Sequence, residues 1–158
     1  MVELPRRPTA LFVGLGGGTQ LLLLAARVRP RFMTAVERDP VILQVAQRYF
    51  GLGRLARTEI LCGDIERVLP CLESAGRRFD FIMEDAAYAD PVDRALPIAL
   101  RLAGLLGTRG VLVLNRNACH HAAETAAALR RGGARVTMRR VRRDGDNVLI
   151  SATDARRA

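Results

Sequence analysis

The chain alternates between short apolar runs and longer segments in which apolar residues recur at helical spacing. The apolar runs are rich in Val, Ile, Leu and Phe, a composition typical of buried strands. We expect strands at Ala10–Val13, Met33–Val36, Glu59–Cys62, Phe79–Met83 and Val111–Asn115. The helical spacing predicts helices at Thr19–Arg27, Pro40–Gly51, a short segment ending near Leu72, Asp93–Leu106 and His120–Arg131.

Two further strands are expected at the end of the sequence. Ala134–Arg139 and Asn147–Ser151 flank the turn sequence RRDGDN, so they pair as a hairpin. The other connections are too long for hairpins, which indicates a parallel sheet with helices on both faces. We therefore predict one α/β domain over residues 1–158, a doubly wound three-layer sandwich. Its seven-stranded sheet is mostly parallel with an antiparallel C-terminal hairpin, whose exposed edge favours a homodimer.

The first predicted strand ends in a cluster of glycines, in the sequence ALFVGLGGGTQ. Glycine costs conformational entropy, so such a cluster indicates a sharp turn or close backbone approach to a ligand. Ligands of open α/β sheets bind at the carboxyl ends of the strands, beside the first strand. Four predicted strand ends carry informative groups at that edge: Gly14–Thr19, Glu37, Asp64 and Asp85.

Two of these acidic residues point to a nucleoside. Glu37 stands 19 residues after Gly18, where a carboxylate can accept hydrogen bonds from both ribose hydroxyls. Asp64 beside the Ile65 amide offers the acceptor and donor that an adenine edge requires. A dinucleotide site prefers G-x-G-x-x-G or G-x-G-x-x-A, whereas Thr19 occupies the last position here. The residues therefore favour S-adenosylmethionine over a dinucleotide.

Each of these residues also has a plain structural interpretation. Glu37 could pair with Arg38, and Asp64 could cap the helix that follows it. Asp85 could cap the next segment, and Tyr88 could be a packing residue. For the neighbouring Glu84, we expect a strand-end side chain that points to solvent.

Six sequence segments in this order resemble a known superfamily: LFVGLGGGTQ, AVERDP, CGDIERVLP, FDFIMEDAAYADP, LLGTRGVLVLN and GDNVLISA. The chain resembles the Rossmann-like (class I) S-adenosylmethionine-dependent methyltransferases, and specifically their spermidine synthase branch, from about Ala10 to Ala152. The resemblance implies a seven-stranded sheet with a reversed C-terminal hairpin.

The resemblance also assigns roles to the strand ends. It places Gly14–Gly18 at the amino-acid part of the cofactor, Glu37 at the ribose, Asp64 at the adenine and Asp85 between cofactor and acceptor. The predicted cofactor-binding residues are Gly14, Leu15, Gly16, Gly17, Gly18, Thr19, Gln20, Glu37, Arg38, Asp64, Ile65 and Asp85. The predicted catalytic residues are Asp85, as proton acceptor, and Tyr88, as a stacking or hydrogen-bonding group. No metal ligands are predicted.

Three departures from the aminopropyltransferases argue against polyamine synthesis. Thr19 replaces an acidic residue of their glycine motif, and Tyr88 replaces the second acid of their Asp-x-x-Asp motif. The predicted first strand begins after nine residues, so we expect no N-terminal β-domain. We therefore predict a methyltransferase that acts on a small-molecule acceptor. The alternatives are an aminopropyltransferase that uses decarboxylated S-adenosylmethionine, and a non-catalytic nucleoside-binding module.

Charge modifies this interpretation only slightly. The net charge is +9, and all 25 basic residues are arginine. Complete avoidance of lysine indicates coding bias more than a binding surface. Nucleic acid is therefore not the expected partner, although the arginine-rich C-terminal edge keeps a nucleic-acid methyltransferase as an alternative.

The remaining composition predicts a cytoplasmic protein with reduced cysteines. Cys62, Cys71 and Cys119 lack metal-site spacing and are expected to be buried thiols. No apolar run is long enough to span a bilayer, so no membrane partner is expected. The first residues lack the apolar core of a signal peptide.

Overall fold

The structure is a computed structural model that describes residues 4–86, 91–117, 120–141 and 147–154. Its strands are β1 (Thr9–Val13), β2 (Phe32–Glu37), β3 (Thr58–Cys62), β4 (Phe79–Glu84), β5 (Leu106–Asn117), β6 (Ala134–Val141) and β7 (Asn147–Asp154). Its helices are α1 (Thr19–Val28), α2 (Pro40–Tyr49), the 3-10 turn η1 (Leu52–Arg54), α3 (Ile65–Ser74), α4 (Val92–Gly104) and α5 (His120–Arg131).

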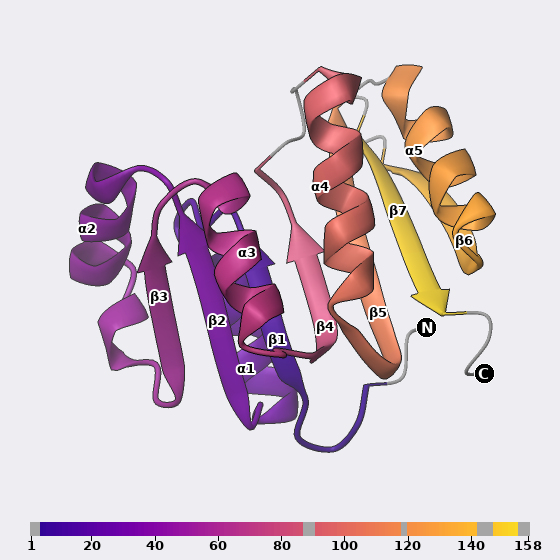
Figure 1. The fold of residues 1–158 in the computed structure, drawn as a ribbon. Helices are drawn as coiled ribbons and strands as arrows, with labels where there is room; N and C mark the ends of the chain where they lie inside the picture. Colours follow the sequence, from indigo (N-terminus) through magenta and orange to yellow (C-terminus); the bar gives the residue numbers. More distant parts are fainter. Residues whose placement is uncertain (1–3, 87–90, 118–119, 142–146, 155–158) are drawn as a thin grey trace.

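The strands form one seven-stranded sheet in the order β3-β2-β1-β4-β5-β7-β6. β1 to β5 are parallel, and β7 runs antiparallel to both β5 and β6 (Figure 1). This confirms the predicted α/β sandwich and its antiparallel C-terminal hairpin. Because β7 lies between β5 and β6, β6 forms the edge of the sheet. β5 begins at Leu106, earlier than predicted, because this residue pairs with Phe79 of β4.

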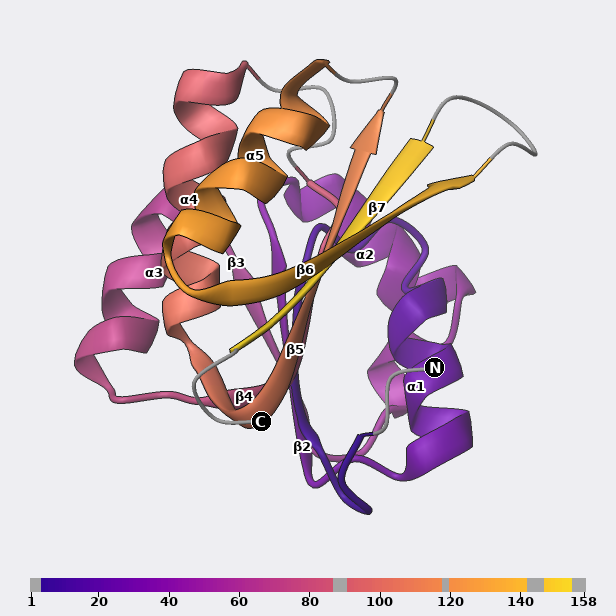
Figure 2. The ribbon, with the colours of Figure 1, turned by 90° about the vertical axis from the view of Figure 1, so that its right-hand side faces the viewer.

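Helices cover both faces of the sheet, with α3, α4 and α5 on one face and α1 and α2 on the other (Figure 2). β1 contributes to both cores. Leu11 and Val13 pack under α3 and α4, while Ala10 and Phe12 pack under α1 and α2. A strand buried on both faces is apolar throughout, which explains why the strand runs were recognisable in the sequence.

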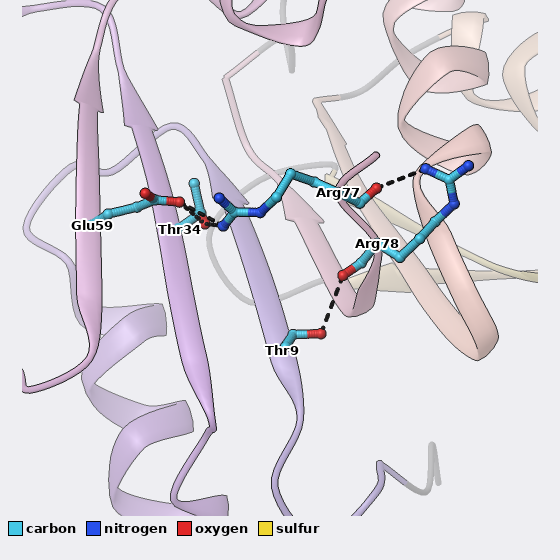
Figure 3. Close-up of polar contacts among 5 residues, drawn as sticks. All are labelled: Thr9, Thr34, Glu59, Arg77 and Arg78. Carbon is cyan, nitrogen blue, oxygen red and sulfur yellow. Dashed lines mark hydrogen bonds and ion pairs between the residues drawn. The ribbon is translucent and has the colours of Figure 1, made fainter. Parts of the chain in front are cut away.

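Polar side chains join the segment before β4 to the neighbouring strands, as Figure 3 shows. The Arg77 guanidinium donates to Thr34 Oγ1 at 2.9 Å and to Glu59 Oε1 at 2.6 Å, which connects this segment to β2 and β3. The Thr9 hydroxyl donates to the carbonyl oxygen of Arg78 at 3.3 Å. These contacts fix the entry into β4.

The carboxyl ends of the central strands are held in register by backbone hydrogen bonds. Gly14, Gly63 and Asp85 each follow a strand, and each donates its N–H to a carbonyl of the neighbouring strand at 2.8–2.9 Å. The glycine loop and the residues after β3 and β4 therefore meet at one edge of the sheet.

The cysteine prediction was wrong in one respect. Cys62 and Cys71 are free thiols, as expected, but both are exposed. Cys62 ends β3, where the edge of the sheet lacks a covering strand, and Cys71 lies on the solvent side of α3. Cys119 lies outside the described residues. Among the helices of the described residues, none is long and apolar enough to cross a membrane.

Candidate cofactor site

A cavity of about 310 Å³ opens at the carboxyl edge of the sheet, where β1, β2, β3 and β4 end. Eight of the predicted cofactor residues line it: Gly14, Leu15, Gly16, Glu37, Arg38, Asp64, Ile65 and Asp85. The other lining residues are Val13, Val36, Ile42, Gly63, Ala86, Arg94 and Ile98. The strand ends that the sequence pattern singled out therefore surround one space.

Glu37 connects the end of β2 to the glycine loop. Its Oε2 atom accepts the Leu15 N–H at 2.9 Å, and its Oε1 atom accepts the Asp39 N–H at 3.0 Å. The residue is only 7% exposed, so its carboxylate is fixed in one orientation. Each carboxylate oxygen has a second lone pair, which leaves Glu37 able to accept hydrogen bonds from hydroxyl groups in the cavity.

Asp64 caps α3 and also forms an ion pair. Its Oδ1 atom accepts the Glu66 N–H at 3.0 Å, which is the helix-capping role considered from sequence. Its Oδ2 atom accepts from Arg94 Nη2 at 2.9 Å. Ile65, the first residue of α3, lines the same cavity, and a first-turn N–H lacks a partner within its own helix. The acceptor and donor predicted for an adenine edge therefore lie side by side.

Asp85 receives one side-chain hydrogen bond on each oxygen. Gln20, in the first turn of α1, donates to Oδ2 at 2.9 Å, and Asn115, in β5, donates to Oδ1 at 2.7 Å. Asn115 was not recognised from sequence. The available signal was its position as the polar residue after the apolar run of β5, which pairs with β4 and so brings Asn115 beside Asp85.

The glycines of the loop serve different purposes. Gly14 has φ +85°, and a Cβ there would lie 3.0 Å from the backbone of Asp85 and Ala86. Gly14 therefore permits the close approach of two chain segments. Gly16 has φ +51° and faces open space, so it is the glycine best placed to leave room for a ligand.

The N-terminus of α1 follows this loop without an anionic cap. Its N-cap is Gly18, which makes no side-chain cap hydrogen bond, and the first turn contains no acidic residue. Free N–H groups and the positive end of the helix dipole favour an anion at such a terminus. Gly17, Gly18, Thr19 and Gln20 do not line the cavity. Gln20 affects the cavity indirectly, because its side chain holds Asp85, which lines the cavity.

The expectation that Glu84 points to solvent was wrong. Glu84 is fully buried and forms an ion pair with Arg116, which is 1% exposed. Its Oε1 atom accepts the Ala86 N–H at 2.9 Å, which fixes the chain where it leaves β4. The pairing partner is in β5, so the sequence of β4 alone could not indicate it. Tyr88, the other predicted catalytic residue, lies outside the described residues.

This sheet order defines the fold. The chain has the Rossmann-like fold of the class I S-adenosylmethionine-dependent methyltransferases. Human methyltransferase-like protein 13, solved in complex with SAH, superimposes with a TM-score of 0.77 at 24% sequence identity, covering 92% of this chain and 71% of that one.

Two curated relatives share sequence with the chain. A polyamine aminopropyltransferase from Vibrio vulnificus (strain CMCP6) is 32% identical over 114 residues, 70% of this chain and 38% of that protein. An eEF1A lysine and N-terminal methyltransferase from Danio rerio is 34% identical over 117 residues, 68% of this chain and 17% of that protein. No family model matches the sequence. The resemblance to class I methyltransferases and to their spermidine synthase branch is confirmed, and the chain spans less than half the length of either relative.

Proposed function

We propose that the protein is an S-adenosylmethionine-dependent methyltransferase that acts on a small-molecule acceptor. The observation that carries this proposal is the convergence of Glu37, Asp64 and Asp85 on one cavity from the ends of β2, β3 and β4. Its volume of about 310 Å³ lies within the range of small-ligand sites. In this proposal Glu37 binds the ribose hydroxyls, and Asp64 with the Ile65 amide binds the adenine edge.

The N-terminus of α1 supports the intact cofactor over its decarboxylated form. S-adenosylmethionine carries a carboxylate on its amino-acid tail, and decarboxylated S-adenosylmethionine does not. Free N–H groups and the helix dipole favour that carboxylate, and Thr19 adds no negative charge to repel it. The residues of this terminus do not line the cavity, so an amino-acid tail that extends past Gly16 to reach it would favour methyl transfer over aminopropyl transfer.

Asp85 is the group proposed to act on the acceptor. The Gln20 and Asn115 amides hold its carboxylate in place at 2.9 and 2.7 Å, and each oxygen retains a lone pair. S-adenosylmethionine supplies a methyl carbon that is electrophilic without further activation. The protein must then orient an amine or hydroxyl nucleophile, exclude water and accept a proton, and Asp85 is positioned to orient the nucleophile and take that proton.

Calorimetric titration tests the proposal. We expect the wild type to bind S-adenosylmethionine and S-adenosylhomocysteine, and to bind decarboxylated S-adenosylmethionine more weakly. Glu37→Ala should reduce affinity for all three by about tenfold or more, since it removes a charged acceptor and releases the glycine loop. The matched control is Glu73→Ala, which removes a carboxylate of α3. Glu73 does not line the cavity. Absence of binding by the wild type would reject the proposal.

Aminopropyl transfer is a second candidate because of the Vibrio vulnificus relative. A preference for decarboxylated S-adenosylmethionine, with an aminopropyl group found on the product by mass spectrometry, would establish it. The Danio rerio relative, by its name, modifies a protein. Protein amines therefore belong in the acceptor screen, and their modification in place of small molecules would reject the small-molecule part of the proposal.

A further inference from the structure

Arg94 is a cavity residue that neither the sequence pattern nor the proposed function includes. It lies in the first turn of α4, and its Nη2 atom donates to Asp64 Oδ2 at 2.9 Å. Its Nε atom lies 3.5 Å from Glu66 Oε1. The side chain therefore reaches from α4 to the start of α3, and it contacts the carboxylate that we assign to the adenine edge.

The position of Arg94 in its helix is electrostatically unfavourable for the helix itself. The first turn of a helix carries the positive end of the dipole, where a cation is disfavoured. Arg101, in the last turn of α4, has the favourable position. Arg94 is thus better explained by its carboxylate partners at the start of α3 than by the stability of α4.

We infer that Arg94 is a specificity-determining residue for the cofactor, because it holds Asp64 in the orientation that accepts the adenine amino group. This inference rests on the proposed function. The Glu66 N–H holds one oxygen of Asp64 and Arg94 holds the other, so the plane of the carboxylate is fixed from both sides. The remaining lone pairs of Asp64 can accept an N–H of the adenine amino group. A base with a carbonyl oxygen in place of that amino group would instead bring two acceptors together, which is unfavourable.

The chain contains a matched control for this contact. Arg101 lies seven residues further along α4 and also pairs with a carboxylate of α3, donating to Glu73 from Nε at 2.9 Å and from Nη2 at 2.7 Å. Neither Arg101 nor Glu73 lines the cavity. Arg101→Ala therefore removes an ion pair between the same two helices without altering the site.

The experiment compares two ligands by calorimetry: S-adenosylhomocysteine, and S-inosylhomocysteine, in which an oxygen replaces the adenine amino group. We expect the wild type to prefer the adenosine compound. Arg94→Ala should weaken its binding by about tenfold and bring the two affinities closer together, since a charge-assisted hydrogen bond that orients Asp64 is lost. Arg101→Ala should leave both affinities as in the wild type. Arg94→Gln, checked by thermal unfolding, replaces Arg94→Ala if that variant does not fold.

Three results would overturn the inference while the proposed function stands: unchanged or tighter binding by the Arg94 variant, equal weakening of both ligands, or the same weakening in Arg101→Ala. Wild-type protein that binds neither ligand would instead remove the proposed function itself, and this inference with it.

Discussion

Asn115 Nδ2 donates a hydrogen bond to Asp85 Oδ1 at 2.7 Å, and this contact joins β5 to the residue that follows β4 at the edge of the candidate cofactor cavity. One residue away on each strand, Glu84 and Arg116 form a buried ion pair. Because successive side chains of a strand point to opposite faces, the two contacts lie on opposite sides of the sheet. Together they fix the position from which Asp85 faces the cavity.

Substitution of Asp85 tests its proposed role as proton acceptor. Asp85→Asn should retain affinity for S-adenosylhomocysteine within about threefold, because the ribose and adenine contacts are assigned to other residues. Methyl transfer to any acceptor that the wild type modifies should fall by about a hundredfold or more, as expected when a positioned proton acceptor is removed. Calorimetry and a transfer assay measure the two effects separately. A variant with wild-type turnover would show that Asp85 does not take the proton.

The buried ion pair should contribute strongly to folding only as an intact pair. Arg116→Met removes the positive charge that pairs with the buried Glu84 carboxylate, a change expected to lower the free energy of unfolding by about 3–5 kcal/mol. The double variant Glu84→Gln/Arg116→Met should lose less than the sum of the two single variants. Urea denaturation measures all three. Arg101→Ala, whose ion pair is exposed, is the control and should leave the free energy of unfolding close to that of the wild type. Additive losses would contradict a coupled pair.

Two glycines of the loop should respond differently to alanine. Gly14→Ala places a Cβ 3.0 Å from the backbone after β4, at φ +85°, and neither segment can move freely. We expect a loss of about 2–4 kcal/mol in the free energy of unfolding, in the range of overpacking combined with backbone strain. Gly16→Ala meets no neighbouring atom, so it should cost about 1–2 kcal/mol from its positive φ alone, and should weaken cofactor binding. Equal stability of the two variants would contradict this difference.

The ion pair between α3 and α4 should be visible in a pH titration. The hydrogen bond from Arg101 holds the pKa of Glu73 below its usual value. A carboxylate with a lowered pKa in the folded state stabilises the fold above its unfolded pKa, and this contribution is lost as the pH falls through the folded pKa. NMR titration of the Glu73 carboxyl should show the lowered value, and Arg101→Ala should return it to the normal range. Because the group is exposed, added salt should reduce the shift. An unchanged pKa in Arg101→Ala would assign the shift to another cause.

The fold was predictable because its determinants are local. Buried parallel strands are apolar throughout, and glycines and acidic residues mark where they end, so both the order of the elements and the positions of Glu37, Asp64 and Asp85 followed from the sequence. The contacts that orient these residues were not predictable. Asn115, Arg94 and Arg116 each act on a residue about thirty positions away, and only the pairing of β4 with β5 and of α3 with α4 brings them together.

The exposure of Glu84 was misjudged for the same reason. A charged residue at a strand end is normally solvated, and the exception arises only where a partner on the neighbouring strand compensates the cost of burial. Cys62 was misjudged in the opposite direction. It is exposed because β3 is an edge strand, which lacks a neighbouring strand on one side.

A crystal structure with S-adenosylhomocysteine tests the central claim most directly. The account predicts that the ribose hydroxyls donate to Glu37, that the adenine amino group donates to Asp64, and that the amino-acid tail lies along the loop at Gly16. A nucleoside bound outside this cavity, or inside it without contact to either carboxylate, would contradict the account.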